Sequence, residues 1–157
     1  MSVAMLRPFL SGSVALLVLL ALPGCAKKNE FETAEVTGAV LYNGEPLKIG
    51  SLLFVPVGGG PTAQANITES GTYSMGTYEL ADGAILGKHK VMITALTSPG
   101  GSGLPEDAIN GNSAAVSVIP EKFGNLERSG LEVEVAPGGN TITFDLTDKE
   151  GKIVVGQ

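Results

Sequence analysis

Several short runs of this chain alternate apolar and polar residues with a period of two, and turn-forming residues separate the runs. The clearest runs are 131–135 and 141–147, which are joined by Ala136 to Asn140. Period two is typical of a strand with one buried face, so the two runs predict a β-hairpin. The residues expected on its buried face are Leu131, Val133, Val135, Ile142, Phe144 and Leu146.

The same reading predicts further strands along the chain. Asn43-Gly44 is a strong turn dipeptide, and Glu69-Ser70-Gly71 predicts a second hairpin between the runs that flank it. About seven strands at close spacing predict an all-β domain, an antiparallel β-sandwich that occupies residues 35–157. The further strands are expected at 35–42, 51–55, 63–68, 72–79, 88–96 and 152–155.

One long segment, residues 97–117, interrupts this rhythm with glycine, serine, proline and asparagine. A loop of this length is usually either functional or disordered, and the composition favours disorder. Residues 120–124 are expected to close the loop, with Phe123 packed as a lid.

The N-terminus, residues 1–24, has the three parts of a secretory signal. Arg7 supplies the positive charge, and the apolar run 14–22 is far shorter than the roughly 20 residues of a membrane-spanning helix. The run ends in Leu22, Pro23 and Gly24, directly before Cys25. This arrangement resembles a bacterial lipoprotein signal, and the alternative is a buried thiol behind a core segment.

The lipoprotein resemblance implies cleavage after Gly24 and diacylation of Cys25. Two acyl chains anchor a protein stably, whereas one gives only marginal binding. Residues 25–34 then form a flexible tether, because they are polar and lack periodicity. We therefore expect a location in the cell envelope, with the domain held on a bacterial membrane and facing the periplasm or the exterior.

Charge and titratable residues exclude several classes of function. Ten Lys and Arg against 16 Asp and Glu give a net charge of −6, and the basic residues are scattered. A nucleic-acid partner is excluded, because such binding needs a positive stripe. One histidine and one cysteine exclude a multi-histidine or cysteine-rich metal site, so no metal and no cofactor are expected.

Five candidate chemical motifs are each better explained as structure. Residues 100–104 miss the nucleophile-elbow pattern, and Gly58-Gly59-Gly60 lacks the Lys-Ser/Thr of a phosphate loop. His89 lies between two lysines and is expected to face solvent. Two acidic groups, Glu106-Asp107 and Asp145 with Asp148 and Glu150, lack the spacing of a calcium loop.

Eight short motifs follow one another along the chain: Val36 to Val40, residues 43–47, Phe54-Val55-Pro56, Gly71-Thr72-Tyr73, residues 87–91, residues 119–123, residues 129–131, and Val135 with residues 137–140. Taken in order, they resemble the carboxypeptidase regulatory-like, transthyretin-like domains of small lipoproteins in planctomycete-type bacteria. The resemblance implies a prealbumin-like or immunoglobulin-like sandwich and no established reaction.

Two functions remain open at this stage. The first is a non-catalytic, lipid-anchored envelope protein with a structural or protein-interaction role, and it is not an enzyme. The alternative is a module that binds carbohydrate or another cell-surface polymer. Sugar rings commonly stack on exposed aromatic residues, and this chain offers no tryptophan and three tyrosines, Tyr42, Tyr73 and Tyr78. Oligomeric state is not predicted.

Overall fold

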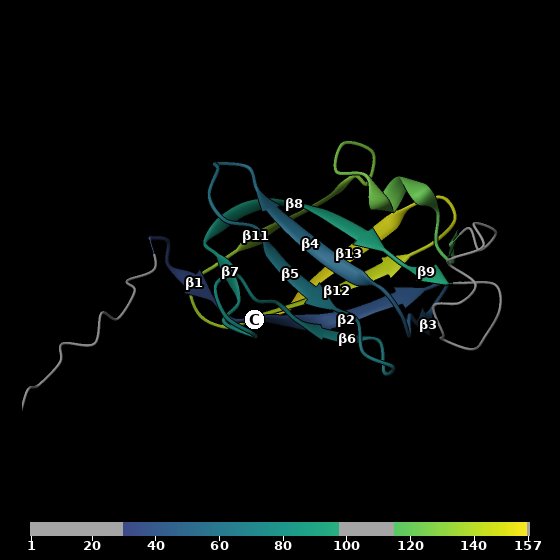
Figure 1. The fold of residues 1–157 in the computed structure, drawn as a ribbon, viewed down its shortest axis with the longest axis horizontal. Helices are drawn as coiled ribbons and strands as arrows, with labels where there is room; N and C mark the ends of the chain where they lie inside the picture. The colour runs from purple at the N-terminus through teal and green to yellow at the C-terminus, as the bar shows by residue number, and fades with distance from the viewer. Residues whose placement is uncertain (1–29, 98–114, 157) are drawn as a thin grey trace, which may run out of the picture.

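A computed structural model describes residues 30–97 and 115–156 of the chain. This part is all-β, with one short 3-10 helix, η1 (Glu121–Gly124). It has thirteen strands, seven of them with four or more residues, so the predicted count of about seven is approximate. Two sheets pack face to face as a β-sandwich-like arrangement (Figure 1).

The four-stranded sheet has the order β11-β8-β4-β5, and the five-stranded sheet has the order β13-β12-β2-β3 with β6 also paired to β2. Two small sheets, β1-β7 and β9-β10, complete the described part. The bounds of the first sheet are β11 (Leu131–Val135), β8 (Gly87–Thr94), β4 (Ser51–Pro56) and β5 (Ala63–Asn66). Those of the second are β13 (Gly151–Gly156), β12 (Asn140–Leu146), β2 (Val36–Tyr42), β3 (Glu45–Pro46) and β6 (Thr72–Ser74). The small sheets consist of β1 (Thr33–Ala34), β7 (Ala84–Ile85), β9 (Leu96–Thr97) and β10 (Val116–Ser117).

The core lies between the inner faces of the two large sheets. Phe54 of β4 meets Phe144 of β12 edge to face, with ring centroids 6.1 Å apart, and both side chains are fully buried. Tyr73 is buried beside Phe144 and donates its hydroxyl to the carbonyl of Ile142 at 2.7 Å. All six residues predicted for the buried face of 131–147 are buried.

The predicted hairpin between 131–135 and 141–147 is wrong. β11 pairs with β8 in one sheet, whereas β12 pairs with β13 and β2 in the other. The connection therefore crosses the sandwich, and the Asn140 side chain holds it by bonding to Ala136 and to Glu35. Alternation identifies the buried face of each strand, but both inward faces of a sandwich give the same pattern.

The second predicted hairpin, around Glu69-Ser70-Gly71, forms only in part. Thr68 and Thr72 close the turn with a 2.9 Å backbone bond, and Gln64 and Gly76 exchange two bonds of 2.9 Å. Between these two points β5 and β6 do not pair, because β5 belongs to the first sheet and β6 to the second.

Three further expectations need adjustment. The sandwich is not purely antiparallel, because β2 and β12 run parallel. Residues 33 and 34, expected in the tether, form β1, and Ala34 is buried. Of the predicted loop 97–117, Thr97 and residues 116–117 pair across β9 and β10.

Residues 98–114 of that loop, which include Glu106-Asp107, lie outside the described residues. The signal segment with Leu22, Pro23 and Gly24 and the proposed lipid site Cys25 also lie outside them. In the described ranges, no helix is long and apolar enough to cross a membrane.

Candidate functional site

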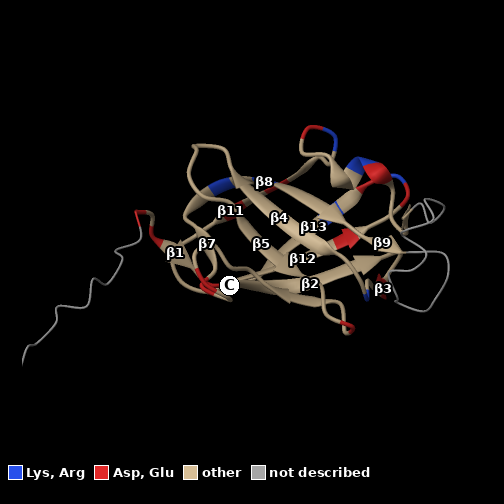
Figure 2. Cartoon of the chain, in the orientation of Figure 1, with Lys and Arg blue, Asp and Glu red and all other residues tan. Residues whose placement is uncertain are grey.

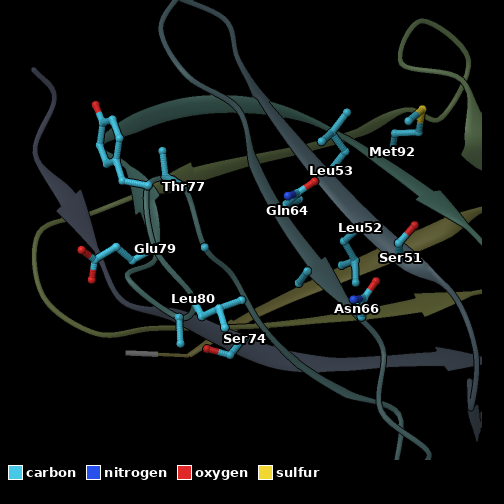
Figure 3. Close-up of a pocket in the computed structure, with 14 residues that line it drawn as sticks. Ser51, Leu52, Leu53, Gln64, Asn66, Ser74, Thr77, Glu79, Leu80 and Met92 are labelled. Atoms are coloured by element: carbon cyan, nitrogen blue, oxygen red, sulfur yellow. The ribbon is translucent and has the colours of Figure 1, made fainter. Parts of the chain in front are cut away.

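A groove of about 590 Å³ opens on the outer side of the sandwich where β5 and β6 separate (Figure 3). Its walls come from β4, β5, one residue of β8 and the segment from Ser74 to Ala81. A concave site with a mixture of apolar and polar groups is the default place to look for a ligand.

The sheet register places two rows of side chains in or beside the groove. In one row, Gln64 of β5 stands opposite Leu53 of β4, which stands opposite Met92 of β8. In the other row, Asn66 stands opposite Ser51, whose hydroxyl lies 3.0 Å from that of Thr94. Apolar and hydrogen-bonding groups therefore alternate along the sheet surface.

The floor of the groove reaches the core because the β5–β6 ladder is interrupted. Asn66 and Ser74 occupy the unpaired position between the Gln64–Gly76 bridge and the Thr68–Thr72 turn, and both line the groove. Leu52, only 1% exposed, also lines it. The incomplete hairpin is thus the structural cause of the groove.

The remaining wall is a loop braced by one carboxylate. Asp82 accepts hydrogen bonds from the backbone N–H groups of Thr77, Tyr78 and Glu79 at 2.6, 3.0 and 3.1 Å. The Thr77 hydroxyl donates to the carbonyl of Gly83 at 2.8 Å. Charge-assisted bonds of this kind hold a short loop in one conformation.

At its tip, this loop holds two residues in unfavourable states. Leu80 is 100% exposed at the rim of the groove. Ala81 has φ +62°, a left-handed conformation that non-glycine residues adopt at a cost of roughly 1–3 kcal/mol. Strain held by a braced loop beside a groove is typical of a preorganised contact site.

The groove offers binding chemistry. β4 and β5 carry no charged residue (Figure 2), and Glu79 is the one charged residue among the described residues that line the groove. The described residues that line the groove include no histidine and no cysteine, and the Ser51 hydroxyl bonds to another hydroxyl instead of a base. Serine needs an adjacent base to act as a nucleophile. The groove can therefore bind a neutral ligand through hydrogen bonds and apolar contacts.

The prediction that His89 faces solvent is wrong, because its side chain is fully buried. It lies on the inner face of β8, 6.0 Å from the Phe54 ring centroid. The Nδ1–H group donates to the carbonyl of Gly87 at 2.9 Å, which leaves Nε2 as a buried acceptor without a partner in the described part. Burial lowers the pKa of His89 below 6.5, only partly opposed by the bond to Gly87. This histidine is a neutral core residue and does not line the groove.

Within the described residues there is no cluster of three or more metal-ligating side chains, and this covers Asp145, Asp148 and Glu150 but not Glu106-Asp107. Asp148 accepts a hydrogen bond from Tyr42, and this bond raises the Tyr42 pKa above its usual value. Glu132 and Glu134 are exposed on β11, opposite Lys90 and Lys88. Gly58 to Gly60 lie in the turn region after β4.

Among the three tyrosines considered for sugar stacking, only Tyr78 lines the groove. Its side chain is 38% exposed, and its hydroxyl accepts a bond from the Phe31 N–H group. Burial removes Tyr73 from this role and raises its pKa.

Sequence reasoning missed the groove, although two signals were present. Gln64 and Asn66 alternate with Ala63 and Ala65, which marks a strand with a hydrogen-bonding outer face. Asp82-Gly83 after a leucine and an alanine marks a tight turn with an apolar tip. Comparisons with protein-family models, curated proteins and solved structures found no match to this chain.

Proposed function

We propose that the protein is a non-catalytic, lipid-anchored protein of the cell envelope, and that its β-sandwich binds a partner protein through the groove beside β5. The N-terminal pattern that ends at Cys25 supports the anchor, and the ordered motifs support kinship with carboxypeptidase regulatory-like domains. The observation that carries the binding role is the braced loop that presents Leu80 fully exposed beside the groove.

A protein partner suits the apolar part of this surface. Leu80, Leu53 and Met92 line the groove, and Leu52 lies on its floor. A flexible methionine adapts to different contact surfaces, and a preorganised loop lowers the entropy lost on binding. An anchored domain with such a surface would hold a second envelope protein close to the membrane.

A neutral polysaccharide is the second candidate ligand, favoured by the uncharged hydrogen-bonding groups of the groove. Two amide side chains, Gln64 and Asn66, project from the same face of β5 with hydroxyls on either side, Ser51 and Ser74. Sugar hydroxyls are uncharged donors and acceptors, and an amide offers both. Only Tyr78 provides an aromatic ring for stacking.

The anchor is tested by replacing Cys25 with alanine and fractionating the cells. We expect the native chain in the membrane fraction and the C25A chain in the soluble fraction, because no acyl chain is attached. Unchanged membrane retention of C25A would rule out lipid anchoring.

The groove is tested in intact cells with a photo-crosslinking residue at Gln64. The matched control carries the same residue at Glu134, which is also exposed on the outer face of this sheet but lies outside the groove. We expect a protease-sensitive adduct from position 64 only. An adduct that resists protease but loses mass after glycan degradation would favour the polysaccharide, and equal yields at both positions would refute the groove as the binding surface.

A further inference from the structure

The sheet edges differ in how they are protected from pairing with another chain. The edge strand β11 carries exposed glutamates at 132 and 134, and the edge strand β5 is bridged to Gly76. On the β2 side, β3 has two residues, including Pro46, and β6 has three. Charge, proline, covering segments and short length are the usual means of blocking an edge.

Strand β13 has only one of these protections, the single charge of Lys152 near one end. It spans six residues without proline, and Lys152 is its one charged residue. In the described ranges, β12 is its sole strand partner, so the other side of β13 is free. Val154 and Val155 are 51% and 53% exposed, and Ile153 is only partly buried. An exposed apolar edge of this kind is a template for strand addition.

We propose that β13 pairs in antiparallel fashion with β13 of a second copy of this chain, about a two-fold axis at Val154. Residues directly opposite each other in a sheet must lie on the same face, so a two-fold axis must pass through a residue. The axis at Val154 places Ile153 opposite Val155 and Val154 opposite itself. The three apolar residues that β13 exposes are then paired with one another.

Charge and size favour this register over its neighbour. With the axis at Val154, Lys152 stands opposite Gly156, and the two lysines lie at the far ends of the paired segment. With the axis at Ile153, each Lys152 would stand opposite Val154, and Val155 would stand opposite Gly151. In that register, neither Val154 nor Val155 stands opposite an apolar side chain.

The occupant is a second copy because the edge is complementary to itself. In an isologous contact, the same surface of both copies pairs with itself about a two-fold axis. In residues 152–156, an axis at Val154 pairs apolar side chains with apolar side chains and each lysine with a glycine. The glutamates of β11 do not oppose this contact, since Glu132 and Glu134 point to the outer face of the other sheet, opposite Lys90 and Lys88. The contact joins the five-stranded sheets of two copies into one continuous sheet.

Cysteine crosslinking tests both the contact and its register. The full chain carries Cys25→Ser, which removes its single native cysteine, together with Val154→Cys or Lys152→Cys. At the axis, the two substituted residues are within disulfide reach, whereas two thiols at position 152 would lie about 13 Å apart along the strands. We expect a covalent dimer from V154C under mild oxidation and a monomer from K152C. Equal crosslinking of both variants, or of neither, would overturn the proposal.

A charge at the axis provides the second arm of the test. Val154→Lys places two ammonium groups face to face, and the matched control is Val116→Lys, at a 50% exposed valine in β10. By sedimentation velocity, we expect a dimer for the native chain and for V116K, and dimerisation at least about tenfold weaker for V154K. A native chain that stays monomeric at millimolar concentration would overturn the proposal. Groove binding is measured separately, so either proposal can fail alone.

Discussion

Replacing His89 by phenylalanine is expected to remove a loss of stability that the native protein shows in mild acid. The imidazole is buried in the core, its Nδ1–H group is bonded to the Gly87 carbonyl, and its Nε2 atom has no partner in the described part. Protonation of Nε2 would place a charge with a new N–H donor beside the Phe54 ring, 6.0 Å away. The folded state therefore resists protonation, and the pKa of His89 falls below 6.5.

The sign of the effect follows from proton counting. Below pH 6.5 the unfolded chain binds a proton at His89 and the folded chain does not, so the free energy of unfolding decreases as the pH falls. The slope approaches about 1.4 kcal/mol per pH unit, and the loss between about pH 7.5 and 5 is at most about 2 kcal/mol. That limit holds if the folded state takes up no proton in this interval. Above pH 6.5, His89 is mostly neutral in both the folded and the unfolded chain, so it no longer lowers the free energy of unfolding.

Urea unfolding of the purified protein between about pH 7.5 and 5 measures this loss, in a range above the ordinary carboxylate pKa values. His89 is the single histidine of the chain, so the slope is assigned to one group. We expect H89F to show no such slope and to exceed the native stability at the acidic end. His89→Leu serves as a second apolar variant in case the larger ring strains the core. A native slope that persists in either folded variant would refute the reasoning.

Three further perturbations test the fold and the groove. Tyr73→Phe removes a buried 2.7 Å hydrogen bond to the Ile142 carbonyl and should cost about 1–1.5 kcal/mol in urea unfolding; an unchanged midpoint would contradict this. Gly38→Ala places a Cβ atom 1.8 Å from the Ile142 carbonyl oxygen and should cost at least about 3 kcal/mol, whereas Gly139→Ala meets nothing within 4 Å and should unfold like the native chain. Asp82→Ala should accelerate amide exchange in the groove wall and leave the core strands protected; unchanged exchange in the wall would show that the carboxylate does not brace it.

The sequence was sufficient to predict which faces of the strands are buried, but not which strands are neighbours. The alternation of 131–135 and 141–147 identified six core residues correctly, because burial is a local property of each strand. The pairing of those runs was wrong, because the four residues after Val135 carry the chain from one sheet to the other. Turn-forming residues allow both a hairpin and a crossing, and the partners that decide between them lie far away in the sequence.

The prediction for His89 was wrong because it considered the charge of the neighbouring lysines and not the alternation of faces along the strand. Lys88 and Lys90 point to the outer face of β8, and a strand places every second residue on the opposite face. His89 therefore shares the inner face with Val91 and Ile93, and the alternation along this strand would have predicted that it lies in the core.

The groove could not be predicted from any local sequence pattern. Its walls come from residues 51–53, residues 64–66, the segment 74–81 and Met92, which only the topology brings together. Its cause is a missing pair between β5 and β6, which follows from the assignment of these strands to different sheets.

The parallel pairing of β2 with β12 has a consequence for how the protein is made. Residues 36–42 acquire this neighbour only when residues 140–146 have been synthesised, about 100 residues later. Contacts between such distant segments must overcome a large loop-closure entropy, which slows folding. The second sheet therefore cannot be completed before residues 140–146 have been made. The newly made chain stays open for longer than one built of local hairpins. A chain that stopped before residue 140 would leave β2 paired only with β3 and β6, so the edge that β12 covers in the complete fold would be open to aggregation.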